Sequence, residues 1–288
     1  AGRRIWAKIT GAPAKAGEKL LLIREDYLGP LRHGQKIAIV GGGPAGAACA
    51  ITLKELAEKR RIDLEVTIFE GKTFEGVPHY NQCMGVLSPP IKEILEYRLR
   101  VPFPKLLVER IIRGYILHSD RSAIKLEGMG DNSYGVRRIN FDQYMLDEAR
   151  KRGVNIVQSR VTGLEITATR VMIYSETEGL AADAVVGAFG LDDGWIRLFE
   201  QAAPYRPPQE MASIVTKIHP GLEKVEAFGD YIHAFLPHNP EIQFGAIVPK
   251  KDHLSINIAG LKLTAKMMGQ FFTLPAVKAI LPPDFDRF

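Results

Sequence analysis

Three consecutive glycines, Gly41 to Gly43, interrupt the chain between a short apolar run and a stretch of helical composition, in the segment KIAIVGGGPAGAACAITL. Glycine is a poor former of both helices and strands, but it permits backbone conformations and close approaches that a side chain would block. A glycine cluster at the junction of two regular elements therefore predicts that something lies directly against the bare main chain.

The glycines sit inside a longer pattern of alternating strand and helix. The β-branched run at residues 36–40 predicts a strand, residues 45–59 predict a helix, and LEVTIFE at residues 64–70 predicts a second strand. This is the order of a βαβ unit. A glycine motif alone is weak, but in this setting it favours a dinucleotide-binding fold over an ordinary glycine turn.

Each glycine of the motif Gly41-x-Gly43-x-x-Gly46 has a physical role in such a unit. The first glycine allows the tight turn, the second lets a pyrophosphate reach the backbone, and the third lets helix and strand pack closely. The helix N-terminus then offers N–H donors and a positive dipole end to the phosphates. Glu70, at the end of the second strand, would accept hydrogen bonds from a ribose. An acid there suits the adenosine ribose of FAD and of NAD alike, so the motif leaves the dinucleotide open.

Length and pattern predict how the chain is divided. At 288 residues, it is long enough for two domains of ordinary size. We predict an α/β fold with an N-terminal extension at residues 1–35 and a Rossmann-like βαβ domain at residues 36–204, which carries an inserted loop and helices. From about residue 205 the pattern changes to short β-rich segments, which predicts a second, mostly β domain at residues 205–288 that covers the substrate.

Charge and residue usage exclude several other classes. The net charge of +5 is spread among mixed signs without a basic stripe, so no nucleic-acid binding is expected. Two cysteines are too few for a disulfide framework or an iron–sulfur cluster. The dispersed histidines show no metal-binding spacing, so no metal is expected. The absence of a long apolar run or a secretory signal predicts a cytoplasmic protein without a transmembrane segment.

Several segments resemble one family of flavoproteins. GGGPAGAACA resembles the FAD-binding motif of glutathione-reductase-like proteins, and RINFDQYMLDEARKRG is similar to the Arg-x-x-Phe-Asp segment of the geranylgeranyl reductase family. YNQCMGVLS is similar to that family's Cys-x-Gly segment beside the flavin ring. IQFGAIVPKKDHLSINIAG resembles its aromatic-x-x-x-x-Pro-Lys segment, on the sheet that covers the flavin. The resemblance spans residues 36–260 in scattered motifs and implies FAD as the cofactor.

The resemblance also implies a set of site residues. Arg138 would lie near the FAD diphosphate, and Cys83 would lie beside the flavin ring. Cys83 is the candidate catalytic residue, acting as a nucleophile or proton donor, although we favour a role in shaping the pocket. The implied cofactor-binding residues are Gly41, Gly43, Pro44, Ala45, Gly46, Glu70, Arg138, Val161 and Gly190.

The chain departs from the family pattern in two places near the cofactor. Phe189 stands where relatives often carry the acid of a Gly-Ala-Asp-Gly segment, and Asp192 or Asp193 is a candidate to compensate. The family's late Gly-Asp-Ala segment, which binds the ribityl chain and diphosphate, is not found before Phe288. We therefore expect that a C-terminal FAD-binding segment follows, or that the FAD site is incomplete.

The resemblance implies an FAD-dependent oxidoreductase that reduces prenyl double bonds. The expected substrate is an isoprenoid or another apolar small molecule, which fits peripheral contact with a membrane. Gly245 and Ala246 stand where many relatives carry Trp, which predicts a wider or reshaped substrate cavity. No second glycine motif of this kind occurs, so the expected electron donor is ferredoxin or a directly docking NAD(P)H.

Two other functions fit the same residues. A flavin-dependent monooxygenase or hydroxylase would use the same scaffold and the same cofactor. A non-catalytic nucleotide-binding subunit, or a fragment of a larger complex, would use the glycine motif without the chemistry.

Overall fold

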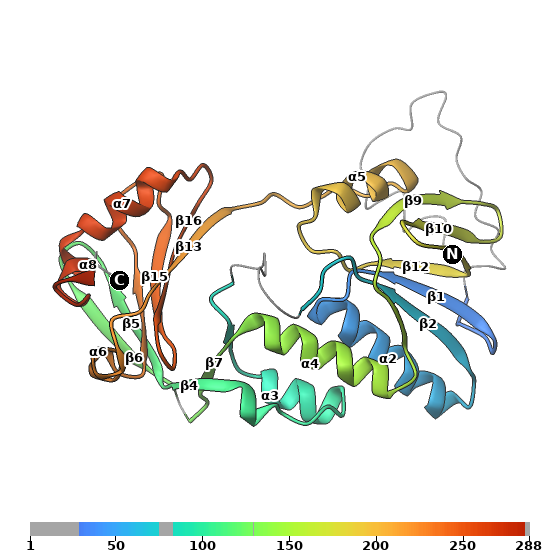
Figure 1. Cartoon of the computed structure of the whole chain (residues 1–288), viewed down its shortest axis with the longest axis horizontal. Helices are drawn as coiled ribbons and strands as arrows, with labels where there is room; N and C mark the ends of the chain where they lie inside the picture. The colour runs from blue at the N-terminus through green and yellow to red at the C-terminus, as the bar shows by residue number, and fades with distance from the viewer. Residues whose placement is uncertain (1–28, 75–82, 129, 286–288) are drawn as a thin grey trace, which may run out of the picture.

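The computed structural model of the chain describes residues 29–74, 83–128 and 130–285. Most of the predicted N-terminal extension therefore lies outside the described residues. Two lobes stand side by side, each built on its own sheet, with a small three-stranded sheet between them (Figure 1). The predicted α/β fold, with a Rossmann-like unit and a second, mostly β part, is confirmed.

The first lobe is built on a parallel sheet in the order β12-β1-β2-β8. A three-stranded antiparallel meander, β11-β10-β9, packs beside it. The strands of the two sheets are β1 (Gln35–Val40), β2 (Leu64–Phe69), β8 (Asn155–Val157), β12 (Ala184–Gly187), β9 (Val161–Ile166), β10 (Val171–Ser175) and β11 (Gly179–Ala182). The helices of this lobe are α2 (Pro44–Arg60), α4 (Arg138–Lys151) and α5 (Asp193–Ala202).

Burial on both faces explains why β1 is apolar along its length. Ile37 and Ile39 belong to a core with α2 and α4, whereas Ala38 and Val40 belong to a second core with the meander and Trp195. A parallel strand covered on both sides needs apolar residues at successive positions instead of alternate ones. This requirement places the carboxyl end of β1, and the glycines that follow it, at the centre of the lobe.

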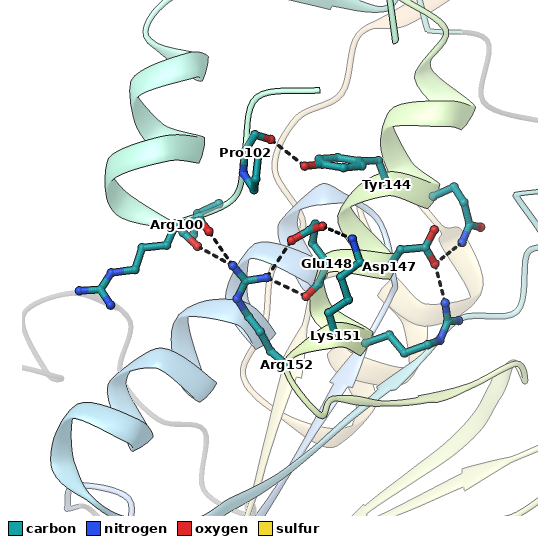
Figure 2. A network of polar contacts seen from close by, with 10 residues as sticks. Arg100, Pro102, Tyr144, Asp147, Glu148, Lys151 and Arg152 are labelled. Atoms are coloured by element: carbon teal, nitrogen blue, oxygen red, sulfur yellow. Dashed lines mark hydrogen bonds and ion pairs between the residues drawn. The ribbon is translucent and has the colours of Figure 1, made fainter. Parts of the chain in front are cut away.

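The C-terminal half of α4 is held by a network of charged groups (Figure 2). The side chain of Glu148 is only 7% exposed and pairs with Lys151 Nζ at 2.7 Å and Arg152 Nη1 at 3.0 Å. Arg152 Nη2 also donates to the carbonyl oxygen of Arg100 at 2.7 Å. Burial alone would raise the pKa of Glu148, but hydrogen bonds from Lys151 and Arg152 outweigh it and lower that pKa.

This network predicts a pH-dependent contribution to stability. A lowered carboxyl pKa gives its full stabilisation above the unfolded pKa of about 4.3, and this stabilisation is lost as the pH falls through the lower pKa of the folded state. Glu148→Gln should therefore lower the free energy of unfolding by about 1–3 kcal/mol at pH 7, and by less near pH 3. Urea unfolding at both pH values measures the difference. Asp147→Asn on the same helix, whose carboxylate is 42% exposed, is the control and should change stability by less than about 1 kcal/mol. A Glu148→Gln effect that is equal at both pH values would contradict the charge argument.

A small antiparallel sheet, β3-β7-β4, lies between the lobes. Two of its strands adjoin segments that the sequence analysis assigned to the site, since Gly85 comes directly before β3 and Arg138 lies two residues after β7. The elements of this region are β3 (Val86–Leu87), α3 (Ile91–Glu93), η2 (Ile94–Arg98), η3 (Lys105–Leu107), β4 (Val108–Ile112) and β7 (Ser133–Val136).

The second lobe is built on a six-stranded sheet in the order β13-β16-β15-β14-β5-β6. Its pairs are antiparallel except β14 with β5, which run parallel. The strands are β5 (Gly114–His118), β6 (Ala123–Glu127), β13 (Ala212–Ile218), β14 (Tyr231–Phe235), β15 (Phe244–Pro249) and β16 (Leu254–Gly260). The helices are α6 (Leu222–Phe228), α7 (Ala265–Thr273) and α8 (Pro275–Lys278).

The two faces of this sheet differ. Helices α7 and α8 cover the outer face and pack on Ile256 and Ile258, while the other face is turned toward the first lobe (Figure 1). A Cβ on Gly245 would lie 2.3 Å from the ring of Phe271, so position 245 faces α7 and not the first lobe. Of the two small residues expected to widen the cavity, only Ala246 therefore points toward the other lobe, because neighbouring residues of a strand alternate in direction.

The predicted division after residue 204 stays a prediction, but the sheets do not follow it. Strands β5 and β6, from the middle of the first predicted domain, complete the sheet of the second lobe. The chain therefore enters the second lobe twice.

The helices can be compared with the length that a membrane-spanning helix needs. Within the described ranges, none combines the length and apolar character needed to cross a bilayer. Peripheral contact stays a prediction.

Candidate cofactor site

The glycine loop between β1 and α2 separates two kinds of glycine. Gly41 has a φ of +108°, and a Cβ there would lie 2.5 Å from the carbonyl oxygen of Ala188. A Cβ on Gly46 would lie 1.9 Å from the carbonyl oxygen of Gly41. A Cβ on Gly43, by contrast, would meet no described atom within 4 Å. Gly41 and Gly46 are thus required by the packing of the protein on itself, whereas Gly43 faces open space.

The first turn of α2 is suited to an anion. Gly43 is the N-cap residue and Pro44 follows it, no side chain among the described residues caps the turn, and the turn contains no acid. The backbone N–H groups at a helix start carry a partial positive charge that attracts phosphate. The 17-residue helix therefore directs this end at the open space beside Gly43.

Glu70 closes the loop from the end of β2. Its side chain is buried, with Oε2 accepting from Gly42 N–H at 2.8 Å and Oε1 accepting from Lys72 N–H at 2.8 Å. Each carboxylate oxygen can accept more than one hydrogen bond, so a ribose hydroxyl could be added to these contacts. Glu70 therefore braces the glycine loop, a role that the motif alone did not predict.

Arg138 and Cys83 come together although they are distant in sequence. Arg138 Nη1 lies 3.7 Å from Cys83 Sγ, and Arg138 Nε donates to the buried carboxylate of Asp142. Cys83 is exposed, and its sulfur accepts from Gly85 N–H at 3.4 Å. Asp142 thus fixes the arginine that contacts the thiol.

Val161 and Gly190 lie near the other side of β1. Val161 is buried, and its carbonyl oxygen accepts from the indole N–H of Trp195 at 3.0 Å. Gly190 has a φ of +59°, and a Cβ there would meet no described atom within 4 Å. Only backbone groups are therefore offered to a ligand at these two positions.

Phe189 and Asp192 lie in the segment that leads into α5. Phe189 packs on Trp195 and Phe199, where it belongs to the core beneath α5. Asp192 is the N-cap of α5, and its Oδ1 accepts from Gly194 N–H, Trp195 N–H and Arg160 Nη2. Its Oδ1 thus caps the helix, and its role as the compensating acid stays a prediction. Asp193 lies in the first turn of the same helix.

Lys250 is the lysine of the Pro-Lys segment quoted in the sequence analysis, although it was not among the predicted site residues. It is 2% exposed, and its Nζ donates to the carbonyl oxygens of Gly85 at 2.7 Å and Val136 at 3.0 Å. Burial lowers the pKa of Lys250 to about 8, against the opposing effect of the nearby Glu109 carboxylate. The Pro-Lys motif draws attention to this lysine but does not predict its burial, which depends on carbonyl oxygens of distant segments.

A second cluster also escaped the sequence analysis. His219, Asp252 and His253 have potential ligand atoms within 4.8 Å of one another, because β13 and β16 pair beside them. Arg137 Nη2 lies 3.5 Å from Asp252, and this positive charge opposes cation binding. The expectation of no metal stays a prediction.

Two hollows of about 420 and 450 Å³ occur elsewhere in the described structure. One lies between α2 and Arg152, and the other is lined by β4 and Tyr134. Neither is lined by a predicted cofactor residue. The glycine loop is placed as the candidate site by its chemistry and not by the size of a hollow.

No protein-family model matches the chain, and no curated protein matches its sequence. Solved structures do match. A flavoprotein/dehydrogenase from Cytophaga hutchinsonii is 20% identical, with a TM-score of 0.63, over 88% of this chain and 63% of that one. A geranylgeranyl bacteriochlorophyll reductase-like protein from Thermoplasma acidophilum is 16% identical, with a TM-score of 0.64, over 86% and 64%. A mutant of the halogenase PltM in complex with FAD is 12% identical, with a TM-score of 0.63, over 87% and 57%.

These likenesses show that the chain has the fold of these flavoproteins. The chain spans 63% and 64% of the length of the first two, so it corresponds to part of each.

Proposed function

We propose that the chain binds FAD and belongs to an FAD-dependent oxidoreductase. The observation that carries this proposal is the open space at Gly43, at an uncapped helix N-terminus, in a fold shared with a halogenase solved with FAD. The first turn of α2 would hold the diphosphate, and Glu70 would hold the adenosine ribose. Arg138 would lie toward the diphosphate. Bound FAD supplies hydride chemistry that no side chain can perform.

The proposed reaction is the reduction of a prenyl double bond. One alkene carbon takes a hydride and the other takes a proton. NAD(P)H would supply the two electrons and the proton of the hydride together, whereas ferredoxin would supply the electrons in two single steps and solvent would supply that proton. The geranylgeranyl reductase-like neighbour supports this choice. So does the sheet face that is turned toward the first lobe, where the register aligns Tyr115, Leu117, Ala234 and Ala246 on one side. An apolar face beside the cofactor site suits an isoprenoid chain.

A monooxygenase or hydroxylase is the second candidate. The same sheet face carries polar residues on β16, since Ala246 pairs with Asn257 and Val248 pairs with Ser255. Other solved neighbours include a flavin-dependent brominase and a peptidyl tryptophan dihydroxylase. A more polar substrate would fit this half of the face.

A non-catalytic subunit is the third candidate, because the chain spans only part of the length of its structural neighbours.

The test begins with the colour of the purified protein, prepared both as residues 1–288 and as the complete encoded protein. Bound oxidised flavin absorbs near about 450 nm. Two colourless proteins that also fail to bind added FAD would overturn the proposal. The coloured protein is then reduced without oxygen and mixed with a geranylgeranyl substrate. Return of the absorbance supports alkene reduction, whereas substrate-dependent oxygen consumption supports the hydroxylase.

A further inference from the structure

The buried lysine between the lobes joins the two backbone segments that carry Cys83 and Arg138. Lys250 lies where β15 ends, and its backbone N–H closes a turn on His253. Its Nζ reaches across to the small sheet and donates to Gly85 O and Val136 O, at 2.7 and 3.0 Å. Gly85 comes two residues after Cys83, and Val136 comes two residues before Arg138.

The groups around the Lys250 ammonium are linked to one another by hydrogen bonds. Gly85 O accepts from Val136 N–H at 2.8 Å as well as from Lys250. On the other side, Gly85 N–H donates to Cys83 Sγ, which Arg138 Nη1 approaches to 3.7 Å. One amino group from the second lobe thus fixes both segments at the point where the thiol and the guanidinium meet.

The space for the ammonium depends on two glycines. A Cβ on Gly85 or on Gly135 would each lie 3.3 Å from Lys250 Nζ. Gly85 also has a φ of +62°, and its Cβ would lie 2.0 Å from Val136 O. Residues with side chains would force the ammonium away from the two carbonyls. The backbone here is shaped around the lysine head group.

We propose that Lys250 is a positioning residue of the cofactor site, which holds Cys83 and Arg138 in their mutual placement. The assignment to a cofactor site rests on the proposed function, whereas the mutual placement of Cys83 and Arg138 is found in the protein without a ligand. A lysine that served only to join the lobes would affect stability and leave the thiol unchanged. The reactivity of Cys83 separates the two roles.

The experiment uses the full chain without FAD, in a Cys49→Ala background, so that iodoacetamide reports on Cys83. Arg138 Nη1 lies 3.7 Å from this exposed sulfur, and a positive charge held beside a thiol favours its reaction with iodoacetamide. Lys250→Met should release the two segments, let the Arg138 guanidinium move away from the thiol, and slow the labelling by about 5-fold or more. Lys251→Met is the matched control, because Lys251 is exposed, and should stay within about 2-fold of the parent protein.

A second measurement is the affinity for added FAD, which should fall about 10-fold in Lys250→Met and remain unchanged in Lys251→Met. Lys250→Gln, which keeps N–H donors but no charge, serves if the methionine variant does not fold, and should also slow labelling. Unchanged labelling in a folded variant, with or without a lower melting temperature, overturns the proposal. Failure of both variants to fold assigns Lys250 to the fold and also overturns it. Failure of the parent protein to bind FAD refutes the proposed function, but leaves the labelling result intact.

Discussion

Gly43→Val should abolish the retention of FAD while the protein remains folded. Its φ of −65° and ψ of −178° are accessible to a β-branched residue, and no described atom lies within 4 Å of the new Cβ. The side chain would occupy the space in which we place the diphosphate. We expect the affinity for FAD to fall by about 100-fold or more, and the free energy of unfolding by only about 1 kcal/mol. Titration with FAD and urea unfolding measure the two quantities.

Two other glycines provide the controls for this prediction. Gly269→Val places the same side chain in open space at an exposed position of α7, and FAD affinity should not change. Gly46→Val would place Cβ 1.9 Å from a carbonyl oxygen and should unfold the first lobe. If Gly43→Val keeps both its fold and its FAD, the phosphates do not lie at this loop.

Glu70→Ala should weaken the cofactor site and the fold together. The substitution leaves Gly42 N–H and Lys72 N–H without their acceptor and removes the predicted acceptor for the ribose. We expect a loss of about 1–3 kcal/mol in the free energy of unfolding and of roughly 10- to 100-fold in affinity for FAD. The affinity for ADP should fall with it, because ADP carries the same ribose.

A milder variant separates the two effects of Glu70. Glu70→Gln retains an oxygen that can accept from Gly42 N–H, so it should preserve more stability than Glu70→Ala. It still lacks the charged acceptor and should bind FAD and ADP more weakly than the parent protein. Wild-type affinity for ADP in both variants would remove Glu70 from the ribose site and leave it as a brace of the loop.

Local patterns were sufficient to predict the glycine loop. The βαβ order, the apolar β1 and the start of α2 depend on residues that are neighbours in sequence. The roles assigned to Gly41 and Gly46 follow from close packing within that short unit, and the structure agrees with both. The open space at Gly43 is likewise a property of the loop itself.

Interactions between segments that are distant in sequence could not be predicted in this way. The burial of Lys250 depends on two carbonyls that lie 165 and 114 positions away. The capping of α5 by Asp192 depends on where that helix begins, and Gly245 faces α7 because of the register of β15. Sequence spacing does not fix any of these distances or directions. The family resemblance therefore identified the segments near the site but not the contacts that their residues make.

The pairing of β5 with β14 has a consequence for how the chain is made. His118 and His233 are hydrogen-bonded across these strands although they are 115 positions apart. During synthesis, β5 and β6 must therefore wait until β14 has left the ribosome, and closing so long a loop is entropically costly. A fragment that begins at residue 205 would present β14 with an unpaired edge, which favours aggregation. The second lobe is thus not a separate folding unit, because its sheet is complete only when the nascent chain has returned to its own earlier strands.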